Sequence, residues 1–293
     1  MVTDHKKGFL MQSFGLYANP LKDKDFIHTR HIMRILKEKN INFCIDGQLA
    51  EEFPEFPHCE LEKPGVMLVL GGDGTMLSAA RKYAQAGTLF LGINLGRLGF
   101  LLETEYHEVE QAIDAILEGD FSVEERCILE TKIRKGDGSE FVTGLALNDA
   151  VISRRQVMRL VDVHISINEQ YSDNFVGDGV IISTPTGSTG YSLSAGGPVI
   201  SPTLDLMLIT PVCPHRLSSK SMVISAKDRV EIRTSADADG AMLTLDGQMS
   251  AELEENDSVL VGTADFKAKF IRFKKRDFYT MFKEKLSEWN SLK

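Results

Sequence analysis

The spacing of hydrophobic and polar positions differs between two parts of the chain. In the first part, short apolar runs typical of buried strands alternate with segments whose apolar residues recur every three or four positions, as in amphipathic helices. Strands are expected at residues 14–18, 41–45, 66–70 and 88–93, and helices at residues 23–39, 75–86 and 106–117. Such alternation predicts a parallel sheet with helical crossovers.

From residue 121 onward the pattern changes to short β-rich runs separated by turns that contain glycine and aspartate, which is typical of a β-sandwich. These runs are residues 127–134, 141–153, 160–167, 180–183, 207–212, 222–224, 230–233, 241–245, 258–261 and 266–273. Residues 277–289 return to helical spacing and are expected to pack on the first domain.

We therefore predict an α+β fold of two domains. Residues 1–120, completed by residues 276–293, form an N-terminal α/β nucleotide-binding domain with a Rossmann-like parallel sheet. Residues 121–275 form a β-rich, sandwich-like C-terminal domain, and a C-terminal helix returns to the first domain.

Composition narrows the class of partner. The chain has 293 residues, of which 43% are hydrophobic and 26% charged, and its net charge of −9 argues against general attraction to nucleic acid or an anionic membrane. The four cysteines are widely spaced, which indicates free thiols in a reducing compartment. No signal peptide is evident and no run approaches the ~18–20 apolar residues of a membrane span, so a cytoplasmic protein is expected.

The most informative segment is Gly71-Gly72-Asp73-Gly74, which lies between an expected strand and an expected helix that Thr75 would cap. In this geometry bare main-chain N–H groups can face a phosphate. Asp73 suits a general base for a hydroxyl nucleophile, or a partner for a phosphate-bound cation. An ordinary turn with an acidic tip is an equally good interpretation of this motif alone.

A second segment, residues 178–198, combines an apolar strand with a loop dense in hydroxyls and glycines. Such a loop suits a ligand that carries sugars and phosphates, and Tyr191 can stack on a base. The alternative is a polar surface loop. The donors are Ser183, Thr184, Thr186, Ser188, Thr189, Ser192 and Ser194, and the accessible glycines are Gly187, Gly190, Gly196 and Gly197.

Three further features are open to two interpretations. Asn148-Asp149 could hold a ribose edge or form a simple turn. Residues 94–101 follow a strand at the edge where α/β sheets bind ligands, and Arg97 there either meets phosphate or lies on the surface. A basic cluster at Arg154, Arg155 and Arg159 is a solvated face or a phosphate contact. Asp237, Asp239 and Asp246 are most simply turn acids.

These motifs, Gly71–Thr75, residues 94–101, Asn148-Asp149 and residues 178–198, occur in this order and with similar spacing in the ATP-NAD kinases. The chain resembles bacterial members of that family over nearly all of its length. The most specific part is residues 184–198. The glycine turn alone is also found in lipid kinases and phosphofructokinases.

The resemblance implies an enzyme that transfers the γ-phosphoryl group of ATP to the 2′-hydroxyl of the adenosine ribose of NAD, giving NADP. Residues 121–275 would then bind NAD, a divalent ion (Mg²⁺) would assist, and ATP or polyphosphate would be the donor. The partners would be nucleotides and further copies of the chain, as a dimer or tetramer. The alternatives are a non-catalytic dinucleotide sensor and a lipid or sugar kinase with the same glycine turn.

The resemblance also assigns residues. Asp73 would be the catalytic base, Tyr191 would lie against a base of the ligand, and Asp178 would bind the far portion of the dinucleotide. Metal ligands are not indicated. The nucleotide contacts would be Asp73, Gly74, Asn148, Asp149, Arg159, Asp178, Thr186, Thr189, Gly190, Tyr191, Ser192, Leu193, Ser194 and Gln248.

The sequence departs from the family pattern at several positions. Asp149 stands where Glu is usual, which shortens the reach of the carboxylate by about one methylene, and Gly190 replaces Ala. Ser78 and Val176 stand where some relatives have a basic residue, which leaves open how the donor phosphates are neutralised.

Overall fold

The computed structural model describes residues 13–96, 99–155, 160–216, 218–235, 240–273 and 278–291. The chain divides into two compact units, residues 1–125 with 268–293 and residues 126–267. The first is an α/β unit and the second is β-rich, which confirms the α+β fold predicted from the sequence.

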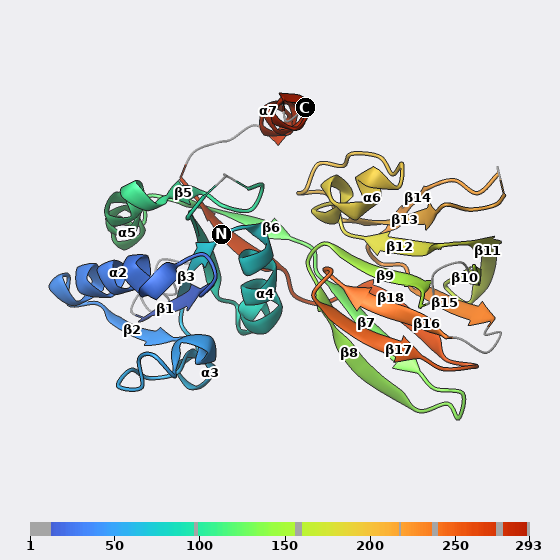
Figure 1. Cartoon of the computed structure of the whole chain (residues 1–293), viewed down its shortest axis with the longest axis horizontal. Coiled ribbons are helices and arrows are strands. Elements are labelled where there is room, and N and C mark those ends of the chain that lie inside the picture. Colours follow the sequence, from blue (N-terminus) through green and yellow to red (C-terminus); the bar gives the residue numbers. More distant parts are fainter. Residues whose placement is uncertain are drawn as a thin grey trace. The chain divides into compact units, whose positions relative to one another are not determined.

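The first unit is built on a seven-stranded sheet with the order β2-β1-β3-β4-β19-β6, and β5 also pairs with β4 (Figure 1). The pairs β1–β2, β1–β3, β3–β4, β4–β5 and β4–β19 are parallel, as the alternating pattern predicts. The strands are β1 (Ser13–Ala18), β2 (Asn42–Ile45), β3 (Val66–Gly71), β4 (Leu89–Asn94), β5 (Thr104–Glu105), β6 (Ser122–Arg126) and β19 (Ala268–Arg272).

Helices cover both faces of this sheet (Figure 1). Ile32 of α2 and Ile113 of α5 share a buried core with Leu68 of β3, whereas Ser78 of α4 bonds the hydroxyl of Tyr17 on β1 at 2.7 Å. Each fully buried aliphatic side chain contributes roughly 1.5–3 kcal/mol. The helices of this unit are α2 (Ile27–Glu38), α3 (Cys59–Glu62), α4 (Asp73–Tyr83), α5 (Val109–Glu118) and α7 (Phe278–Ser291), with short 3₁₀ turns at Lys24–Phe26, Gly47–Leu49, Ala84–Ala86 and Tyr106–Glu108.

The helix expected to start at residue 23 begins at Ile27 instead. Asp25 and Phe26 have left-handed φ angles of 54° and 52°, which no helix interior tolerates. The buried carboxylate of Asp23 accepts from the main-chain N–H groups of His28 and Thr29 at 2.9 and 2.8 Å. Asp23 therefore satisfies donors of the first turn from outside the helix.

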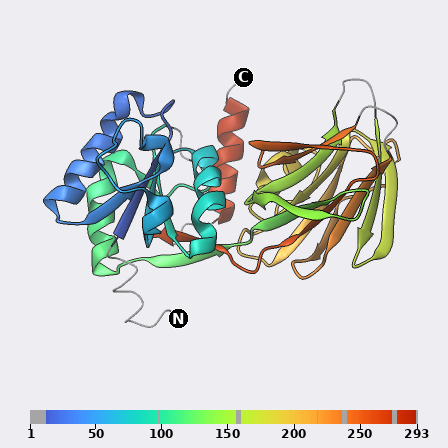
Figure 2. The same cartoon turned by 90° about the horizontal axis from the view of Figure 1, so that it is seen from below.

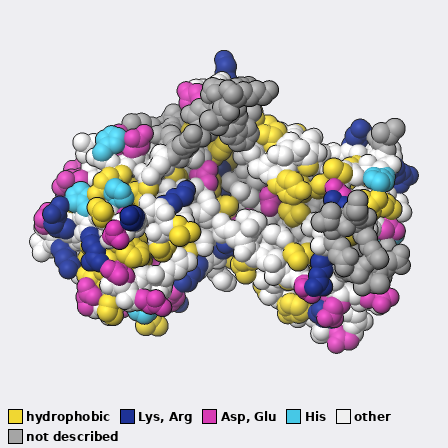
Figure 3. All heavy atoms as spheres, viewed as in Figure 1, with side chains coloured by type: hydrophobic (Ala, Val, Ile, Leu, Met, Phe, Trp, Pro, Cys, Tyr) yellow, Lys and Arg dark blue, Asp and Glu magenta, His cyan; other side chains and the backbone are white. Residues whose placement is uncertain are grey.

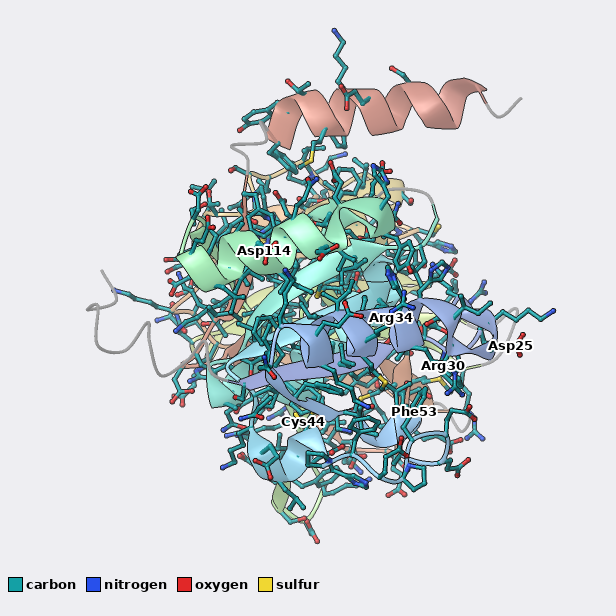
Figure 4. All side chains as sticks on the ribbon, turned by 90° about the vertical axis from the view of Figure 1, so that its left-hand side faces the viewer. Asp25, Arg30, Arg34, Cys44, Phe53 and Asp114 are labelled. Atoms are coloured by element: carbon teal, nitrogen blue, oxygen red, sulfur yellow. The ribbon has the colours of Figure 1, made fainter. Side chains whose placement is uncertain are left out.

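The outward surface of α2 and α5 carries paired charges. Figure 4 labels Arg30 and Arg34 of α2 and Asp114 of α5, and Asp114 accepts from Lys39 at 2.6 Å. Figure 3 shows acidic and basic side chains interspersed over the surface of this unit. On the face drawn there, the negative net charge is thus not gathered into one acidic patch.

The second unit contains two antiparallel six-stranded sheets, seen along their edges in Figure 2. One sheet has the order β11-β10-β15-β18-β7-β8 and the other β14-β13-β12-β9-β16-β17. The strands are β7 (Leu129–Arg134), β8 (Glu140–Ala146), β9 (Asp149–Arg154), β10 (Val161–Ile167), β11 (Gln170–Gly177), β12 (Gly179–Ser183), β13 (Leu206–Val212), β14 (Met222–Ser225), β15 (Val230–Ser235), β16 (Ala241–Leu245), β17 (Met249–Leu253) and β18 (Ser258–Thr263); the 3₁₀ turn Gly187–Thr189 and α6 (Tyr191–Ser194) follow β12.

A single core joins the two sheets. Val163 of β10 and Val259 of β18 pack in one cluster with Ile152 of β9 and Ile182 of β12. The run at residues 141–153, expected as one strand, is two strands in different sheets, because the chain crosses from β8 to β9 at Leu147 and Asn148. This crossing becomes important for the site.

Two strands of the first sheet lie in the sequence outside the segment with α/β patterning. β6 and β19 flank the second unit in the chain, and β19 is parallel to β4 and lies between β4 and β6. Arg272 at the end of β19 pairs with the buried Glu103 at 3.3 Å and with Glu124 at 2.9 Å. The last helix, α7, contacts this unit through Phe282, whose ring lies 6.5 Å from that of Phe100. Across the described ranges, no helix combines the length and apolarity needed to cross a bilayer.

Candidate active site

The glycine turn follows β3, and α4 begins directly at Asp73 with Gly72 as its N-cap. Thr75 was expected to be the cap but occupies the third helical position, where its hydroxyl accepts from the N–H of Gly72 at 3.4 Å. The first turn of α4 therefore presents its main-chain N–H groups and the positive end of the helix dipole at the carboxyl edge of the sheet. Gly74 is exposed there and Asp73 is half-buried.

Two main-chain hydrogen bonds fix the direction of the Asp73 carboxylate. Oδ2 accepts from the N–H of Phe100 at 2.8 Å and Oδ1 from the N–H of Leu101 at 3.0 Å. A Cβ atom built on Gly99 would overlap this carboxylate, so only glycine allows the segment to approach so closely. Each carboxylate oxygen keeps a second lone pair that can accept a proton.

Residues 94–96 lie beside the glycine turn, as their place at the end of a strand predicts. Asn94 is the register partner of Gly71, and the N–H of Leu95 donates to the carbonyl of Gly71 at 3.3 Å. The Asn94 side chain holds both the N–H and the carbonyl of Gly96, at 3.2 and 2.5 Å. Arg97 lies outside the described residues.

A cation that the sequence analysis did not single out lies at the turn. The ammonium of Lys22 approaches Gly72 so closely that a side chain at position 72 would meet it. Lys22 follows the Asn19-Pro20 turn at the end of β1, and Asn19 donates to the hydroxyl of Thr75 at 3.4 Å. Ser78, by contrast, is bonded to Tyr17. Among the described residues, Lys22 has no ion-pair partner.

In the second unit, three segments meet at one edge of the β9–β12–β16 sheet. Since β9 is antiparallel to both neighbours, the start of β9 lies beside the ends of β12 and β16: Asp149 is opposite Ser183, and Ala150 is opposite Leu245. Asn148-Asp149, the loop that begins at Thr184 and the turn at Asp246 are thus brought together. Asn148-Asp149 and the loop are predicted site segments, whereas Asp246 was expected to be a turn acid.

Many hydroxyls of the loop form hydrogen bonds with other groups of the protein and so fix the conformation of the loop. Thr184 Oγ1 donates to the carbonyl of Leu147 at 2.6 Å, Ser188 Oγ donates to Pro185 O at 2.7 Å, and Ser192 Oγ bonds Thr210 Oγ1 at 2.9 Å. Thr186 Oγ1 accepts from Arg126 at 3.2 Å. Ser192 can therefore offer a ligand its main chain rather than a free hydroxyl. Of the ligand contacts predicted within this loop, Thr189, Gly190, Tyr191, Leu193 and Ser194 are accessible to solvent.

Close packing joins the loop to Asn148-Asp149. A Cβ atom on Gly187 would overlap the carbonyl of Asn148, which requires glycine there. A Cβ on Gly190 would lie 3.9 Å from the Asn148 amide nitrogen and 4.0 Å from an Asp149 oxygen. Gly190 therefore borders both polar side chains, and a larger residue there would narrow the space beside them.

The Asp149 carboxylate is buried, and none of the described residues donates a hydrogen bond to it. Burial raises the pKa of Asp149 to about 7, and the negative charge of Asp246 adds to this rise. Asp149 therefore exchanges a proton near neutral pH. Such perturbed carboxyl groups are common at functional sites.

Asp178 lies at the opposite end of β12 from Ser183, roughly 16 Å away at about 3.3 Å per residue. It pairs with Arg154 at 3.3 Å, and Arg155 pairs with Glu252 at 2.9 Å, so both described arginines of the basic cluster have acidic partners. Arg159 lies outside the described residues. Gln248 is exposed on the turn after β16. The assigned ligand contacts of these residues stay predictions.

A hollow of about 1000 Å³ on the second unit contains none of the predicted residues. It is lined by charged groups that pair with one another, including Arg134 with Glu231 at 3.0 Å and Lys135 with Asp257 at 2.8 Å. We do not assign the site to it, because its described cations are already neutralised. Nowhere in the described ranges do three His, Cys, Asp or Glu side chains gather in a way that could hold a metal.

Three residues that shape the site were not predicted from the sequence. Asp246 was interpreted as a turn acid, and Lys22 and Gly99 were not interpreted individually. The available signals were weak: Lys22 stands after an Asn-Pro turn that ends a strand, and Gly99 lies in a segment already placed at the right edge. Nothing in the sequence near Asp246 shows that its carboxylate reaches a segment almost one hundred residues away.

Models of two domains match the chain: the ATP-NAD kinase N-terminal domain at residues 14–121 and the ATP-NAD kinase C-terminal domain at residues 147–273. A protein from Desulforamulus reducens named NAD kinase is 44% identical over 286 residues, covering 96% of this chain and 99% of that protein. A NAD kinase from Natranaerobius thermophilus is 37% identical and covers 94% and 98%.

Solved structures show the same fold. An NAD kinase from Archaeoglobus fulgidus in complex with ATP superposes with a TM-score of 0.71 at 26% identity, covering 92% of this chain and 96% of that one. A yeast NADH kinase complexed with NADH gives a TM-score of 0.82 at 24% identity, covering 96% and 88%.

The fold and the matched domains define a phosphotransferase built from an α/β and a β-rich domain. The chain belongs to the ATP-NAD kinase family. The resemblance predicted from the sequence and the kinase activity that it implies are thereby confirmed.

Proposed function

We propose that this protein transfers the γ-phosphoryl group of ATP to the 2′-hydroxyl of the adenosine ribose of NAD, with Mg²⁺ as the assisting ion. The observation that carries the proposal is the Asp73 carboxylate, held by two main-chain N–H groups in the turn between β3 and α4 of a chain that belongs to this family. The relatives named NAD kinase support the choice of NAD as acceptor.

Asp73 acts as the general base. It accepts the proton of the ribose hydroxyl as the bond from that oxygen to the γ-phosphorus forms and the bond from the γ-phosphorus to the bridging oxygen of ATP breaks, so that ADP leaves. The hydrogen bonds from Phe100 and Leu101 hold the direction of the carboxylate. General-base assistance of this kind is worth roughly 10²–10⁴ in rate, or about 3–5 kcal/mol. The remainder of the rate enhancement comes from positioning and from neutralising phosphate charge.

Lys22 and the first turn of α4 contribute to that neutralisation. The ammonium of Lys22 beside Gly72 supplies positive charge at the turn, although Ser78 is not basic. Mg²⁺ usually binds through substrate phosphates and water with one or two carboxylates, so a turn with one acidic side chain, Asp73, fits it without a dedicated cage. When bound, the ion would withdraw charge from the donor phosphates.

The second unit holds the dinucleotide. Asn148 and Asp149 contact the ribose hydroxyls, and Tyr191, 48% exposed, stacks on a base. Thr186, Thr189, Gly190, Ser192, Leu193 and Ser194 line the ligand, and Gln248 is a further contact. Asp178 binds the far portion of the dinucleotide, which suits its position at the other end of β12, and Arg159 is a further ligand contact.

An end-point assay tests the proposal. NAD is incubated with the protein and either ATP or polyphosphate, with Mg²⁺ or with EDTA, and NADP is measured. We expect NADP with ATP and Mg²⁺ and none with EDTA. NAD binding without NADP would indicate a dinucleotide sensor, and phosphate transfer to diacylglycerol or fructose 6-phosphate instead of NAD would indicate another kinase class.

Assembly and location belong to the same proposal. We expect a homo-oligomer, either a dimer or a tetramer, in the cytoplasm, with no affinity for nucleic acid or membrane. The net charge of −9 argues against nucleic acid and membrane as partners, and the unpaired spacing of the cysteines indicates a reducing compartment. The homo-oligomer is what the resemblance to the family implies. Light scattering of the purified protein gives the size of the assembly.

A further inference from the structure

Asp246 occupies the first position of the tight turn between β16 and β17. Its φ of 51° and that of Gly247, 65°, are both left-handed, and the N–H of Gln248 donates to the carbonyl of Leu245 at 2.9 Å. These are the features of a type I′ hairpin turn, in which Asp and Gly are favoured. The turn explains why the backbone takes this shape, but not where the Asp246 side chain points.

The buried Asp246 carboxylate is directed at the crossing from β8 to β9. It accepts from three consecutive main-chain N–H groups: Leu147 at 3.1 Å through Oδ2, and Asn148 at 2.8 Å and Asp149 at 3.2 Å through Oδ1. In return, the N–H of Asp246 donates to the carbonyl of Asp149 at 2.9 Å. Four hydrogen bonds thus tie the turn to the crossing.

These bonds satisfy the main-chain N–H groups of Leu147, Asn148 and Asp149 at the point where the chain passes from one sheet to the other. The chain leaves one sheet after Ala146 and enters the other at Asp149, so the N–H groups between them face no continuous ladder. Buried N–H groups left without an acceptor would cost about 1–3 kcal/mol each. The shape of the Asn148-Asp149 segment therefore depends on Asp246.

We propose that Asp246 is a positioning residue for NAD: it holds Asn148-Asp149 in the conformation that binds the ribose, and its charge disfavours a second negative charge on Asp149. This inference rests on the proposed function. In this proposal Asp246 does not touch the substrate. It acts through Asn148, which directly precedes β9, and through Asp149, the first residue of β9.

The electrostatic part of the inference follows from the surroundings of Asp149. Besides burial, the negative charge of Asp246 raises the pKa of Asp149. Opposite Asp149 on β12 stands Ser183, and Gly190 of the loop lies nearby; neither is charged. With a pKa of about 7, Asp149 can donate a hydrogen bond to the ribose in its protonated form or accept one in its ionised form.

The test is steady-state kinetics of Asp246→Asn across pH. Asparagine removes the charge and turns an amide N–H₂ toward a main-chain N–H, so one of the three acceptor contacts is lost. We expect KM for NAD to rise about 10-fold, with kcat changed less than about 3-fold. The pH profile of kcat/KM should show an ionisation that is absent in Asp149→Asn and therefore belongs to Asp149. In Asp246→Asn we expect this ionisation to move to lower pH.

Asp257→Asn is the matched control. Asp257 is another buried turn carboxylate of the same unit, which accepts from the N–H of Glu254 at 2.9 Å and from Lys135 at 2.8 Å. Its replacement removes comparable hydrogen bonds away from the site. We expect a loss of thermal stability with KM for NAD and the pH limb unchanged, which separates positioning from general destabilisation.

Asp246→Glu keeps the charge but displaces it by one methylene, and it serves if Asp246→Asn does not fold. We expect a raised KM with the pH limb retained. An unchanged KM for NAD in folded Asp246→Asn or Asp246→Glu, or equal effects in Asp257→Asn, would overturn the inference. If the wild-type protein binds NAD without forming NADP, the proposed function fails separately, and the same variants are then compared by their Kd for NAD.

Discussion

Asp73 and Asp149 are two carboxyl groups at the ends of buried strands, and their surroundings differ in nearly every respect. Asp73 is half-buried at a helix N-terminus, and both of its oxygens accept main-chain N–H bonds. Asp149 is buried, faces the charge of Asp246, and receives no hydrogen bond from the described residues. The N–H groups nearest to Asp149, including its own, donate to Asp246 instead.

The difference shows how main-chain donors assign roles to chemically identical side chains. In the first unit the donors aim the carboxylate that is to receive a proton. In the second unit the main-chain donors bond to the carboxylate of Asp246 and not to that of Asp149, so Asp149 titrates near pH 7. Direction and proton affinity are therefore controlled separately, each by its own local hydrogen bonding and burial.

The largest effect is expected when Asp73 loses its basicity. Asp73→Asn should lower kcat about 10²–10⁴-fold while KM for NAD changes less than about 3-fold, because the amide cannot accept the proton. Steady-state kinetics measures both values, and circular dichroism checks the fold. Asp114→Asn, which affects only a pair with Lys39 on the surface of α5, is the control. Near wild-type turnover of Asp73→Asn would remove Asp73 from the mechanism.

A second prediction concerns stability and Asp149. Its pKa rises from 3.8 to about 7 on folding, so the folded state holds an extra proton between these values and loses this advantage as pH rises. Relative to Asp149→Asn, the wild-type protein should lose at most about 4 kcal/mol of stability between pH 4 and pH 8. Urea unfolding of both proteins at pH 4 and pH 8 measures the difference. Parallel pH dependence in the two proteins would contradict the raised pKa.

A third prediction concerns a substitution that displaces the Asp73 carboxylate but leaves Asp73 itself in place. In Gly99→Ala the new methyl group overlaps the carboxylate, so Asp73 must shift and kcat should fall about 100-fold. Gly96→Ala in the same segment is a suitable comparison, since a methyl group there meets nothing within 4 Å. Equal kcat for the two variants would show that the direction of Asp73 matters little.

The smallest effect is expected at Tyr191. Tyr191→Ala should raise KM for NAD about 10-fold and lower kcat less, because stacking on a base stabilises the ground state and the transition state alike. Tyr171→Ala removes an exposed ring on β11 and should change neither value. A fall in kcat with KM unchanged would place Tyr191 outside the ground-state contact with NAD.

The sequence is sufficient to predict features that depend on neighbours in the chain. The turn at Gly71–Gly74 lies between β3 and α4 as expected, and the parallel order of the first strands follows from their alternation with helices. The family motifs also identify Asn148-Asp149 and the loop after β12. Each of these depends on spacing within about twenty residues, which periodicity reports directly.

Features that depend on distant main-chain groups could not be predicted. A carboxylate in an Asp-Gly turn, such as Asp246, satisfies the turn pattern whether or not it reaches Leu147. The hydroxyls of Thr184, Ser188 and Ser192 were interpreted as ligand donors, but their partners are a carbonyl or hydroxyl of the protein itself. The split of residues 141–153 into two strands could not be predicted either, because an apolar run has the same sequence pattern whether its residues join one sheet or two.

The position of β19 constrains the order in which the chain can acquire its structure during synthesis. This strand lies inside the first sheet, but a ribosome makes it only after all of residues 126–267. Until then Leu89 and Phe90 of β4 lack their β19 partners, Lys269 and Phe270, and the carboxylate of Glu103 lacks the guanidinium of Arg272. The first unit therefore stays incomplete during synthesis, with part of one edge of β4 unpaired, whereas the inserted unit is able to fold before it.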